Sequence, residues 1–275
     1  MNLSKGNTVG ILLIAAIFLN GCASDLRSRS FRKKGIDTES AQKGRELLGK
    51  AAQAHGFDNW YNFETTNVEI QHHFKGMGRM AVALPPKVTV LYQCVNKTFD
   101  VKATILNSKK KGEVWGVVND VTYTVPAGSE EAIWKHKFLG SFFLKTMHYF
   151  TSYYFRILEA TVIGYIGEEE WNGTKYDLVF ASWGEKQPNK EMDQYIIWIN
   201  QETGLIEHSQ FTVRDMPGSF MKGWVSNEDF RNVNGVIIPF KQTERLSLEG
   251  KSFFHQWTLN DLGYDQCDKS SIQVK

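Results

Sequence analysis

The chain has 275 residues, which is enough for one large domain or two modest ones. Its formal net charge of only +2, without a basic helix or stripe, argues against nucleic acid as a partner. Hydrophobic residues make up 42% and aromatic residues 13% of the chain, which suits a sizeable core, the faces of strands and the wall of an apolar pocket.

Residues 1–21 have the pattern of a bacterial lipoprotein signal peptide. Lys5 precedes an apolar run at 9–19, which is shorter than the ~20 residues of a membrane-spanning helix but fits a signal sequence. The run Leu19-Asn20-Gly21-Cys22 resembles a lipobox, where a peptidase cuts before a cysteine that becomes acylated. We therefore predict that Cys22 carries acyl chains such as palmitate and anchors the protein in a membrane. The alternative is a secreted protein with an incidental cysteine.

The residues after Cys22 bear on where the protein is anchored. Ala23 occupies the position where, by the enterobacterial sorting rule, an aspartate retains a lipoprotein in the inner membrane. We predict an outer-membrane lipoprotein that faces the periplasm, with the inner membrane as the alternative. Residues 22–36 are basic and contain little that could pack. We expect a flexible tether there, either simply solvated or with its charges near anionic head groups.

Residues 37–264 show no repeat and no shift in composition, so we predict one domain, followed by a C-terminal tail at 265–275. Its first element is a helix that begins at Asp37 or Thr38 and runs through Ala54. Alternation of apolar and polar residues then predicts an antiparallel sheet. The predicted strands lie at residues 67–74, 88–95, 99–105, 114–118, 121–125, 161–171, 174–183, 194–199, 205–213, 236–246 and 252–262.

Two stretches between these strands receive a different prediction. Ser129, with the two glutamates that follow it, has the pattern of a helix start. Residues 215–223 are predicted to form a loop. Asn172-Gly173 is the strongest hairpin signal in the chain and joins two of the predicted strands.

The stretch 141–159 organises the rest of the chain. Its polar residues recur every three or four positions and therefore form one helical stripe: Ser141, Lys145, His148, Ser152, Arg156 and Glu159. Nearly all its other residues are apolar or aromatic, and a helix that is apolar over most of its circumference must be surrounded. We predict that it lies in the hollow of a curved sheet; the alternative is a core helix under a flat sheet. The charges within it argue against a transmembrane span.

The remaining chemistry is sparse. Cys94 and Cys267 could form a disulfide in an oxidising periplasm or remain two separate thiols. Adjacent His72 and His73 point to opposite faces of a strand, so we do not expect them to share a metal ion. We interpret His148 as a hydrogen-bonded histidine at the mouth of a cavity rather than as a catalytic base. No catalytic, metal-binding or phosphate-binding motif is present, so we predict no enzyme activity, metal or cofactor.

Three short stretches carry a family resemblance. They are Ala51-Ala52-Gln53-Ala54-His55-Gly56 with Trp60, Tyr195-Ile196-Ile197-Trp198-Ile199-Asn200 with Thr203-Gly204-Leu205-Ile206, and Asn234-Gly235-Val236-Ile237-Ile238-Pro239-Phe240. They resemble segments of the LolA-like envelope proteins, a superfamily that includes outer-membrane lipoprotein sorting. The resemblance implies an α+β fold, in which helices cover the concave face of a strongly curved antiparallel sheet, a half-open β-barrel that holds acyl chains. None of the family's functional residues can be matched to a position in this chain.

Our leading hypothesis is a membrane-anchored lipoprotein that binds a lipid or other hydrophobic ligand in the cavity, with a role in envelope lipid or lipoprotein transport. The ligand-lining candidates are Phe142, Phe143, Met147, Phe150 and Tyr154. The alternative is a non-enzymatic envelope interaction or assembly protein that binds a protein partner and whose cavity is filled by its own helix. An enzyme that acts on lipids or glycans is a third hypothesis without a supporting motif.

Overall fold

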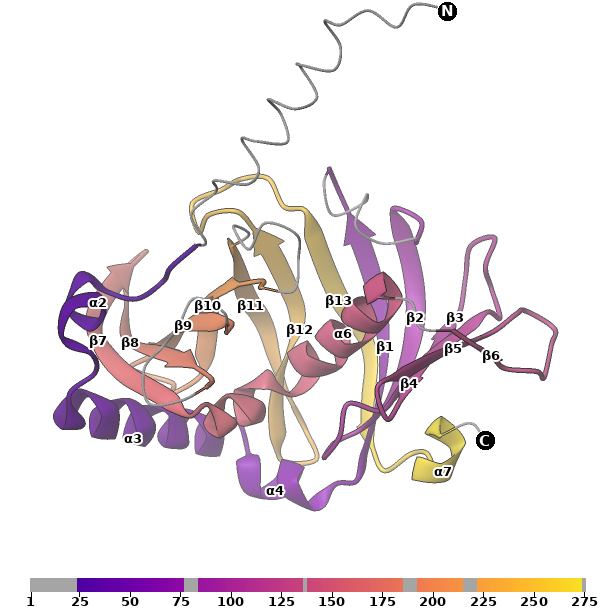
Figure 1. Cartoon of the computed structure of the whole chain (residues 1–275), viewed down its shortest axis with the longest axis horizontal. Helices are drawn as coiled ribbons and strands as arrows, with labels where there is room; N and C mark the ends of the chain where they lie inside the picture. Colours follow the sequence, from indigo (N-terminus) through magenta and orange to yellow (C-terminus); the bar gives the residue numbers. More distant parts are fainter. Residues whose placement is uncertain (1–23, 77–83, 136–137, 185–191, 215–221, 274–275) are drawn as a thin grey trace, which may run out of the picture.

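One antiparallel sheet of 13 strands forms the body of the protein. The structure is a computed structural model that describes residues 24–76, 84–135, 138–184, 192–214 and 222–273, so the predicted signal peptide and Cys22 lie outside the described residues. Figure 1 shows that the sheet curves strongly around a long helix without closing into a barrel. The prediction of an α+β fold with a strongly curved, half-open sheet is confirmed, and the alternative of a core helix under a flat sheet is wrong.

The sheet is built from two meanders. The first contains β1 (Thr65–Phe74), β2 (Lys87–Val95), β3 (Val101–Ile105), β4 (Val114–Val118), β5 (Val121–Val125) and β6 (Ile133–Trp134). The second contains β7 (Val162–Trp171), β8 (Thr174–Ser182), β9 (Gln194–Asn200), β10 (Ile206–Thr212), β11 (Lys222–Val233), β12 (Val236–Arg245) and β13 (His255–Tyr264). The order across the sheet is β6-β5-β4-β3-β2-β1-β13-β12-β11-β10-β9-β8-β7, so the first and last strands join the two meanders.

Between the strands, one element was not predicted and one prediction was wrong; of the loop predicted at 215–223, residues 215–221 lie outside the described residues and 222–223 begin β11. The sequence pattern did not show β11, because the residues of this strand that face the core include Gly223 and the buried, hydrogen-bonded Asn227 instead of an apolar series. The expected helix start at Ser129 is a local turn in which the Ser129 hydroxyl accepts a hydrogen bond from the backbone N–H of Glu131. The chain then enters the short edge strand β6. The hairpin at Asn172-Gly173 is confirmed, with both residues at positive φ.

Helix α6 (Phe138–Arg156) and the 3₁₀ turn η1 (Ile157–Glu159) correspond to the predicted central helix. Figure 1 shows α6 lying across the concave side of the sheet. The polar stripe is largely buried, since His148 is 1% and Arg156 5% exposed. Arg156 is satisfied internally, because its guanidinium donates to the carbonyls of Asn96 (2.5 Å) and Thr98 (2.8 Å). None of the helices in the described ranges is long and apolar enough to cross a membrane.

Helices α3 (Thr38–Ala54) and α4 (Phe57–Asn62) follow one another at one end of the sheet. His55 connects them to the strands, because its Nε2 accepts the N–H of Ile206 (3.0 Å) and its Nδ1 donates to the carbonyl of Ile237 (2.7 Å). Burial lowers the pKa of His55 to about 4. The three stretches with the family resemblance therefore meet at this one side chain.

The segment expected to be a flexible tether is structured from residue 24 onwards. It contains the short helix α2 (Arg29–Lys34), and Leu26 and Phe31 are buried against Val162 and Phe180 of the sheet. The expectation failed because these two apolar side chains lie among many basic ones. At the other end of the chain, helix α7 (Lys269–Ile272) packs on the sheet, with Ile272 fully buried. Cys94 and Cys267 are both free thiols, so the disulfide is not formed.

Candidate functional site: a cavity beside helix α6

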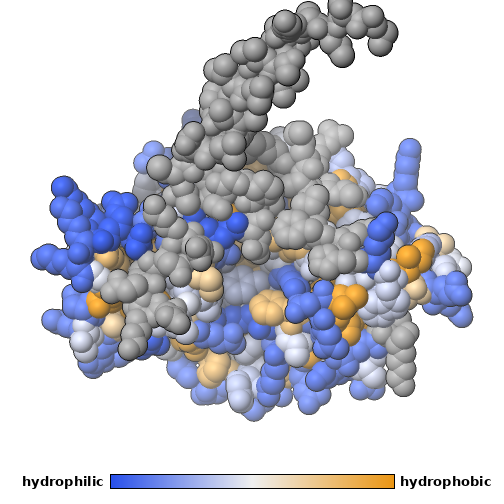
Figure 2. Space-filling view, viewed as in Figure 1, coloured by the Kyte–Doolittle hydropathy of each residue, from blue (hydrophilic) through white to orange (hydrophobic). Residues whose placement is uncertain are grey.

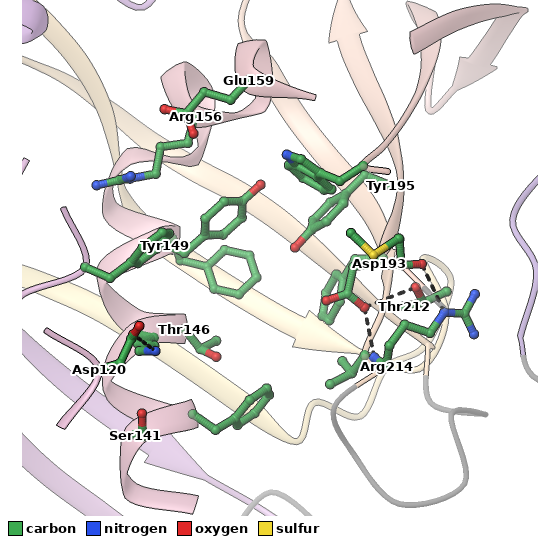
Figure 3. Close-up of a pocket in the computed structure, with 18 residues that line it drawn as sticks. Asp120, Ser141, Thr146, Tyr149, Arg156, Glu159, Asp193, Tyr195, Thr212 and Arg214 are labelled. Carbon is green, nitrogen blue, oxygen red and sulfur yellow. Dashed lines mark hydrogen bonds and ion pairs between the residues drawn. The ribbon is translucent and has the colours of Figure 1, made fainter. Parts of the chain in front are cut away.

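A cavity of about 670 Å³ lies between α6 and the ends of strands β8, β9 and β10 (Figure 3). The helix contributes one wall, which includes Phe142, Thr146, Tyr149 and Phe150. The opposite wall comes from the strand ends and consists of Trp183, Met192, Asp193, Tyr195 and residues 211–214. Phe99 and Asp120, from the first meander, complete the lining.

Aromatic rings make up most of the cavity's apolar surface. Tyr195 on β9 lies opposite Phe211 on β10 in the strand register, and their rings stack with centroids 6.1 Å apart. From the helix, the ring of Phe150 contacts that of Phe211 (5.8 Å), and the ring of Tyr149 contacts that of Tyr195 (6.0 Å). The wall is therefore a set of interlocking rings that presents apolar surface to an occupant.

The hydroxyl of Tyr149 is the exceptional polar group in this wall. It is buried and makes no hydrogen bond of normal geometry with any described residue, although it faces Tyr195. Figure 3 shows both tyrosine rings directed into the cavity from opposite walls. Burial raises the pKa of both hydroxyls, so both remain protonated at neutral pH. The facing Tyr195 hydroxyl is thus the nearest polar group to that of Tyr149, and the pair is the candidate polar contact for a bound molecule in this wall.

Charged groups at the rim are balanced in sign. Lys145 on α6 forms a salt bridge with Asp120. Asp193 accepts the backbone N–H of Arg214 (2.8 Å), and the Arg214 side chain donates to the carbonyl of Met192 (3.2 Å). Among the described residues of the lining, the cations are matched by as many anions: Lys145, Arg156 and Arg214 against Asp120, Glu159 and Asp193. The described part of the lining therefore carries no net charge that would select a highly charged small molecule.

The structure divides the five ligand-lining candidates between two sides of α6. Phe142 and Phe150 line the cavity. Phe143, Met147 and Tyr154 point into the core instead; the ring of Phe143, for example, lies against the ring of His72. Helical periodicity could not tell which side of the helix would be filled by the sheet.

His148 does not lie at the mouth of the cavity, so that interpretation was wrong. It is buried against Phe99, and desolvation together with the nearby Arg156 lowers its pKa to about 3. The residues that the sequence analysis missed are those of the opposite wall, chiefly Trp183, Tyr195 and Phe211. They stand in predicted strands, but only the register of the folded sheet shows that their side chains face the helix.

A second polar cluster lies deep on the filled side of the helix. The imidazoles of His72 and His255 contact each other (3.0 Å), the hydroxyl of Tyr92 contacts His72 (2.9 Å), and Glu244 lies 3.6 Å from His255. Burial lowers the pKa of His72 to about 3 and raises that of Glu244 to about 8, so both are neutral at pH 7. Within the described part of the chain, no group of His, Cys, Asp and Glu is arranged to hold a metal ion.

Comparison with known proteins identifies the architecture. The sequence matches no family model and no curated protein. Among solved structures, an outer membrane lipoprotein-sorting protein domain from Vibrio parahaemolyticus is similar with a TM-score of 0.54 and 8% identity, over 84% of this chain and 97% of that one. A DUF1329 family protein from Desulfovibrio piger is similar with a TM-score of 0.54 and 9% identity, over 85% and 99% of the two chains. The chain has a LolA-like fold.

Identities this low establish the fold and nothing about the ligand. Within this LolA-like fold the hollow of the sheet is only partly occupied by α6, and the cavity is the part that the helix leaves open. What the site does must therefore be argued from its own residues.

Proposed function

We propose that the protein is a membrane-anchored envelope lipoprotein that binds a lipid or another hydrophobic molecule in the cavity beside α6, and that it has no enzymatic activity. The observation that carries this proposal is an aromatic cavity of about 670 Å³, one wall of which holds a buried hydroxyl that makes no hydrogen bond of normal geometry with a described residue. Pockets of this size with apolar walls and few polar groups are typical of small-molecule sites. We place the protein in the outer membrane, facing the periplasm, where its ligand would be an envelope lipid or an acyl chain in transit.

The chemistry of the lining narrows the kind of ligand. Each methylene buried against the rings of Phe150 and Phe211 contributes ~0.8 kcal/mol. A hydrogen bond to the Tyr149 hydroxyl removes the ~1–3 kcal/mol cost of a buried, unsatisfied group. Because the rim charges are balanced, we expect an amphiphile whose polar part is neutral or zwitterionic.

The test uses the Cys22→Ser protein, which cannot be acylated, purified from cells and extracted for mass spectrometry. We expect a co-purifying lipid and saturable uptake of a fluorescent fatty acyl probe. Thr146→Trp, which fills the cavity from α6, should abolish uptake, whereas Lys50→Trp on the exposed surface of α3 should not. No bound lipid and no uptake by the folded protein would refute the proposal.

A second candidate is an envelope interaction protein that binds another protein. The observation in its favour is the free sheet edge β6, where Ile133 is 56% and Trp134 42% exposed. Elsewhere on the face in Figure 2 the described surface is mainly hydrophilic, with apolar residues in small patches. Crosslinking from position 133 to a partner, together with cavity variants that change only stability, would favour this candidate.

A further inference from the structure

The segment that follows the predicted acylation site is fixed to the wall of the cavity. The backbone N–H of Leu26 donates to the side-chain oxygen of Gln194 (2.7 Å), and the Arg214 guanidinium donates to the carbonyl of Ser24. Arg214 also donates to the carbonyl of Met192 (3.2 Å), and both residues line the cavity. The first described residue of the chain is therefore one hydrogen bond away from the cavity lining.

Apolar packing holds this segment in place over several further residues. Leu26 is 9% and Phe31 6% exposed, and the ring of Phe31 meets that of Phe180 edge-on at 6.0 Å. Gly164 allows this close approach, because a Cβ atom there would lie 2.7 Å from the Phe31 ring. A segment held by both hydrogen bonds and a buried aromatic ring gives the anchor a fixed exit point, unlike a free linker.

Covalent geometry then limits where the acyl chains can leave the protein. Cys22 precedes Ser24 by two residues, and consecutive Cα atoms are 3.8 Å apart, so the Cα of Cys22 lies within about 7.6 Å of that of Ser24. Ser24 is held by Arg214 at the end of β9 and β10 that forms the cavity wall, so acyl chains on Cys22 would leave the protein near this end. Figure 1 shows α4 at the opposite end of the sheet.

The charges near this exit point suit a particular surface. Arg29, Arg32, Lys33 and Lys34 of α2 are exposed, and no acidic residue lies between Ser28 and Ile36. Basic side chains beside a lipid anchor are attracted to anionic head groups. The position of the anchor and the charge of α2 both favour a bilayer as the partner of this side of the molecule.

We propose that the end of the sheet carrying residues 192–195 and 211–214 rests on the bilayer that holds the protein's own acyl chains, with α2 on anionic head groups. The cavity then exchanges its ligand directly with that bilayer, and the ligand does not cross water. This inference rests on the proposed function, since it presupposes acylation at Cys22 and a hydrophobic ligand. The protein would load from, or deliver to, the membrane in which it is anchored.

Depth-dependent quenching tests the orientation. The acylated full-length protein, with Cys267→Ser, carries an environment-sensitive fluorophore at one of two positions, Lys222→Cys or Tyr61→Cys. It is placed in vesicles of phosphatidylethanolamine and phosphatidylglycerol that contain spin-labelled lipids as quenchers. Lys222 begins β11 and is exposed near the anchor, while Tyr61 is 54% exposed on α4, which bonds to Gly235 just beyond the other end of β11. The 12 residues of β11 separate the two ends by about 35 Å. We expect severalfold stronger quenching at position 222; equal quenching at both positions would overturn the proposal.

Matched variants test the two contacts that set the orientation. Phe31→Ser should release the segment and make the two positions equally quenched, with the melting temperature recorded to show that the domain stays folded. Arg29→Glu with Lys33→Glu should reduce the difference in quenching, whereas Lys97→Glu with Lys269→Glu, also exposed but remote from the anchor, should not. A difference that persists in all variants would contradict the role assigned to residues 24–36.

Ligand binding is measured separately with the Cys22→Ser protein in solution. If that protein binds no lipid, the proposed function fails whatever the quenching shows. If it binds lipid but positions 222 and 61 are quenched alike in the acylated protein, only the orientation proposal fails. Transfer of a fluorescent lipid from the protein's own vesicle should also be faster than transfer from vesicles without protein.

Discussion

The two sides of helix α6 face the same curved sheet, but one side packs against it and the other borders a cavity. On the filled side, Tyr153 and Tyr154 pack into the core, and their hydroxyls are hydrogen-bonded to Asn227 on β11 and Gln242 on β12. On the open side, Phe142, Tyr149 and Phe150 face β9 and β10 across a cavity, and the Tyr149 hydroxyl has no normal hydrogen bond with a described residue. The filled side is complete without a ligand, whereas the open side provides apolar and polar surface for one.

This difference separates residues that hold the fold from residues that bind. The buried amides Asn227 and Gln242 form a closed network with Tyr153, Tyr154 and Trp257. Such a network fixes α6 against the sheet and keeps the cavity open beside it. Changes on the filled side should therefore affect stability first, and changes on the open side should affect ligand affinity first.

The largest expected effect is that of Gln242→Ala on the filled side. Gln242 accepts a hydrogen bond from the indole N–H of Trp257 (2.6 Å) and donates to Tyr154 (2.9 Å) and Asn227 (2.8 Å). Its removal leaves several buried groups unsatisfied, and we expect a loss of ~3–5 kcal/mol in the free energy of unfolding. Urea titration measures this loss. The control Gln256→Ala removes a partly buried bond to Thr243 and should cost about 1 kcal/mol or less; similar losses in the two variants would contradict the comparison.

The next effect concerns Glu244, at the end of the His72–His255 cluster on the filled side. Burial raises its pKa from 4.5 to about 8, so the folded state holds a proton that the unfolded state releases above pH 4.5. Its contribution to stability is therefore present below pH 4.5 and is lost as the pH rises through 8, at about 1.4 kcal/mol per pH unit. The free energy of unfolding of the wild type should fall by about 3 kcal/mol between pH 5 and 7.5, and Glu244→Gln should abolish this fall.

Denaturation at several pH values, with His72 and His255 intact, measures this change. The neighbouring imidazoles are neutral across this range, because burial lowers the pKa of both. A wild-type stability that does not fall between pH 5 and 7.5 would contradict the protonated Glu244.

His148 should show the opposite pH dependence. Its pKa is lowered from 6.5 to about 3 by burial and by Arg156, so its contribution to stability is present above pH 6.5 and is lost as the pH falls toward 3. Between pH 6.5 and 5, wild type should lose about 2 kcal/mol more than His148→Leu does. Parallel urea titrations at both pH values measure the difference. If the free energy of unfolding changes equally with pH in the two proteins, the lowered pKa of His148 is refuted.

The sequence predicted the architecture better than the site, for a physical reason. Helical and strand periods fix which faces of an element are apolar, and this was enough for a surrounded helix at 141–159 in a curved antiparallel sheet. Periodicity cannot show which apolar face meets the sheet and which meets a cavity. Hence Phe142 and Phe150 were grouped with Phe143, Met147 and Tyr154, which lie in the core.

Strand register and isolated apolar residues were the other missing information. The pairing of Tyr195 with Phe211 requires the β9–β10 register, which the sequence leaves open. The strand β11 was missed because the buried Asn227 is polar, and the docking of residues 24–36 was missed because Leu26 and Phe31 are surrounded by charges. In each case a tertiary contact gives a residue a role that its neighbours in sequence do not indicate.

The smallest expected effect is the most direct test of the open side. Tyr149→Phe removes the unsatisfied hydroxyl and keeps the ring that packs on Tyr195 and Phe150. Without ligand the variant should be as stable as wild type or more stable by about 1 kcal/mol, because a buried polar group without a normal partner is gone. The affinity for a lipid with a polar head should fall by about fivefold to tenfold, the equivalent of one lost hydrogen bond.

The control Tyr153→Phe removes a hydroxyl that is paired with Asn227 (2.7 Å) on the filled side, so it should lower stability by about 1 kcal/mol and leave affinity nearly unchanged. If both variants lose stability and neither loses affinity, the Tyr149 hydroxyl is an ordinary part of the core, and the distinction between the two sides of α6 does not hold.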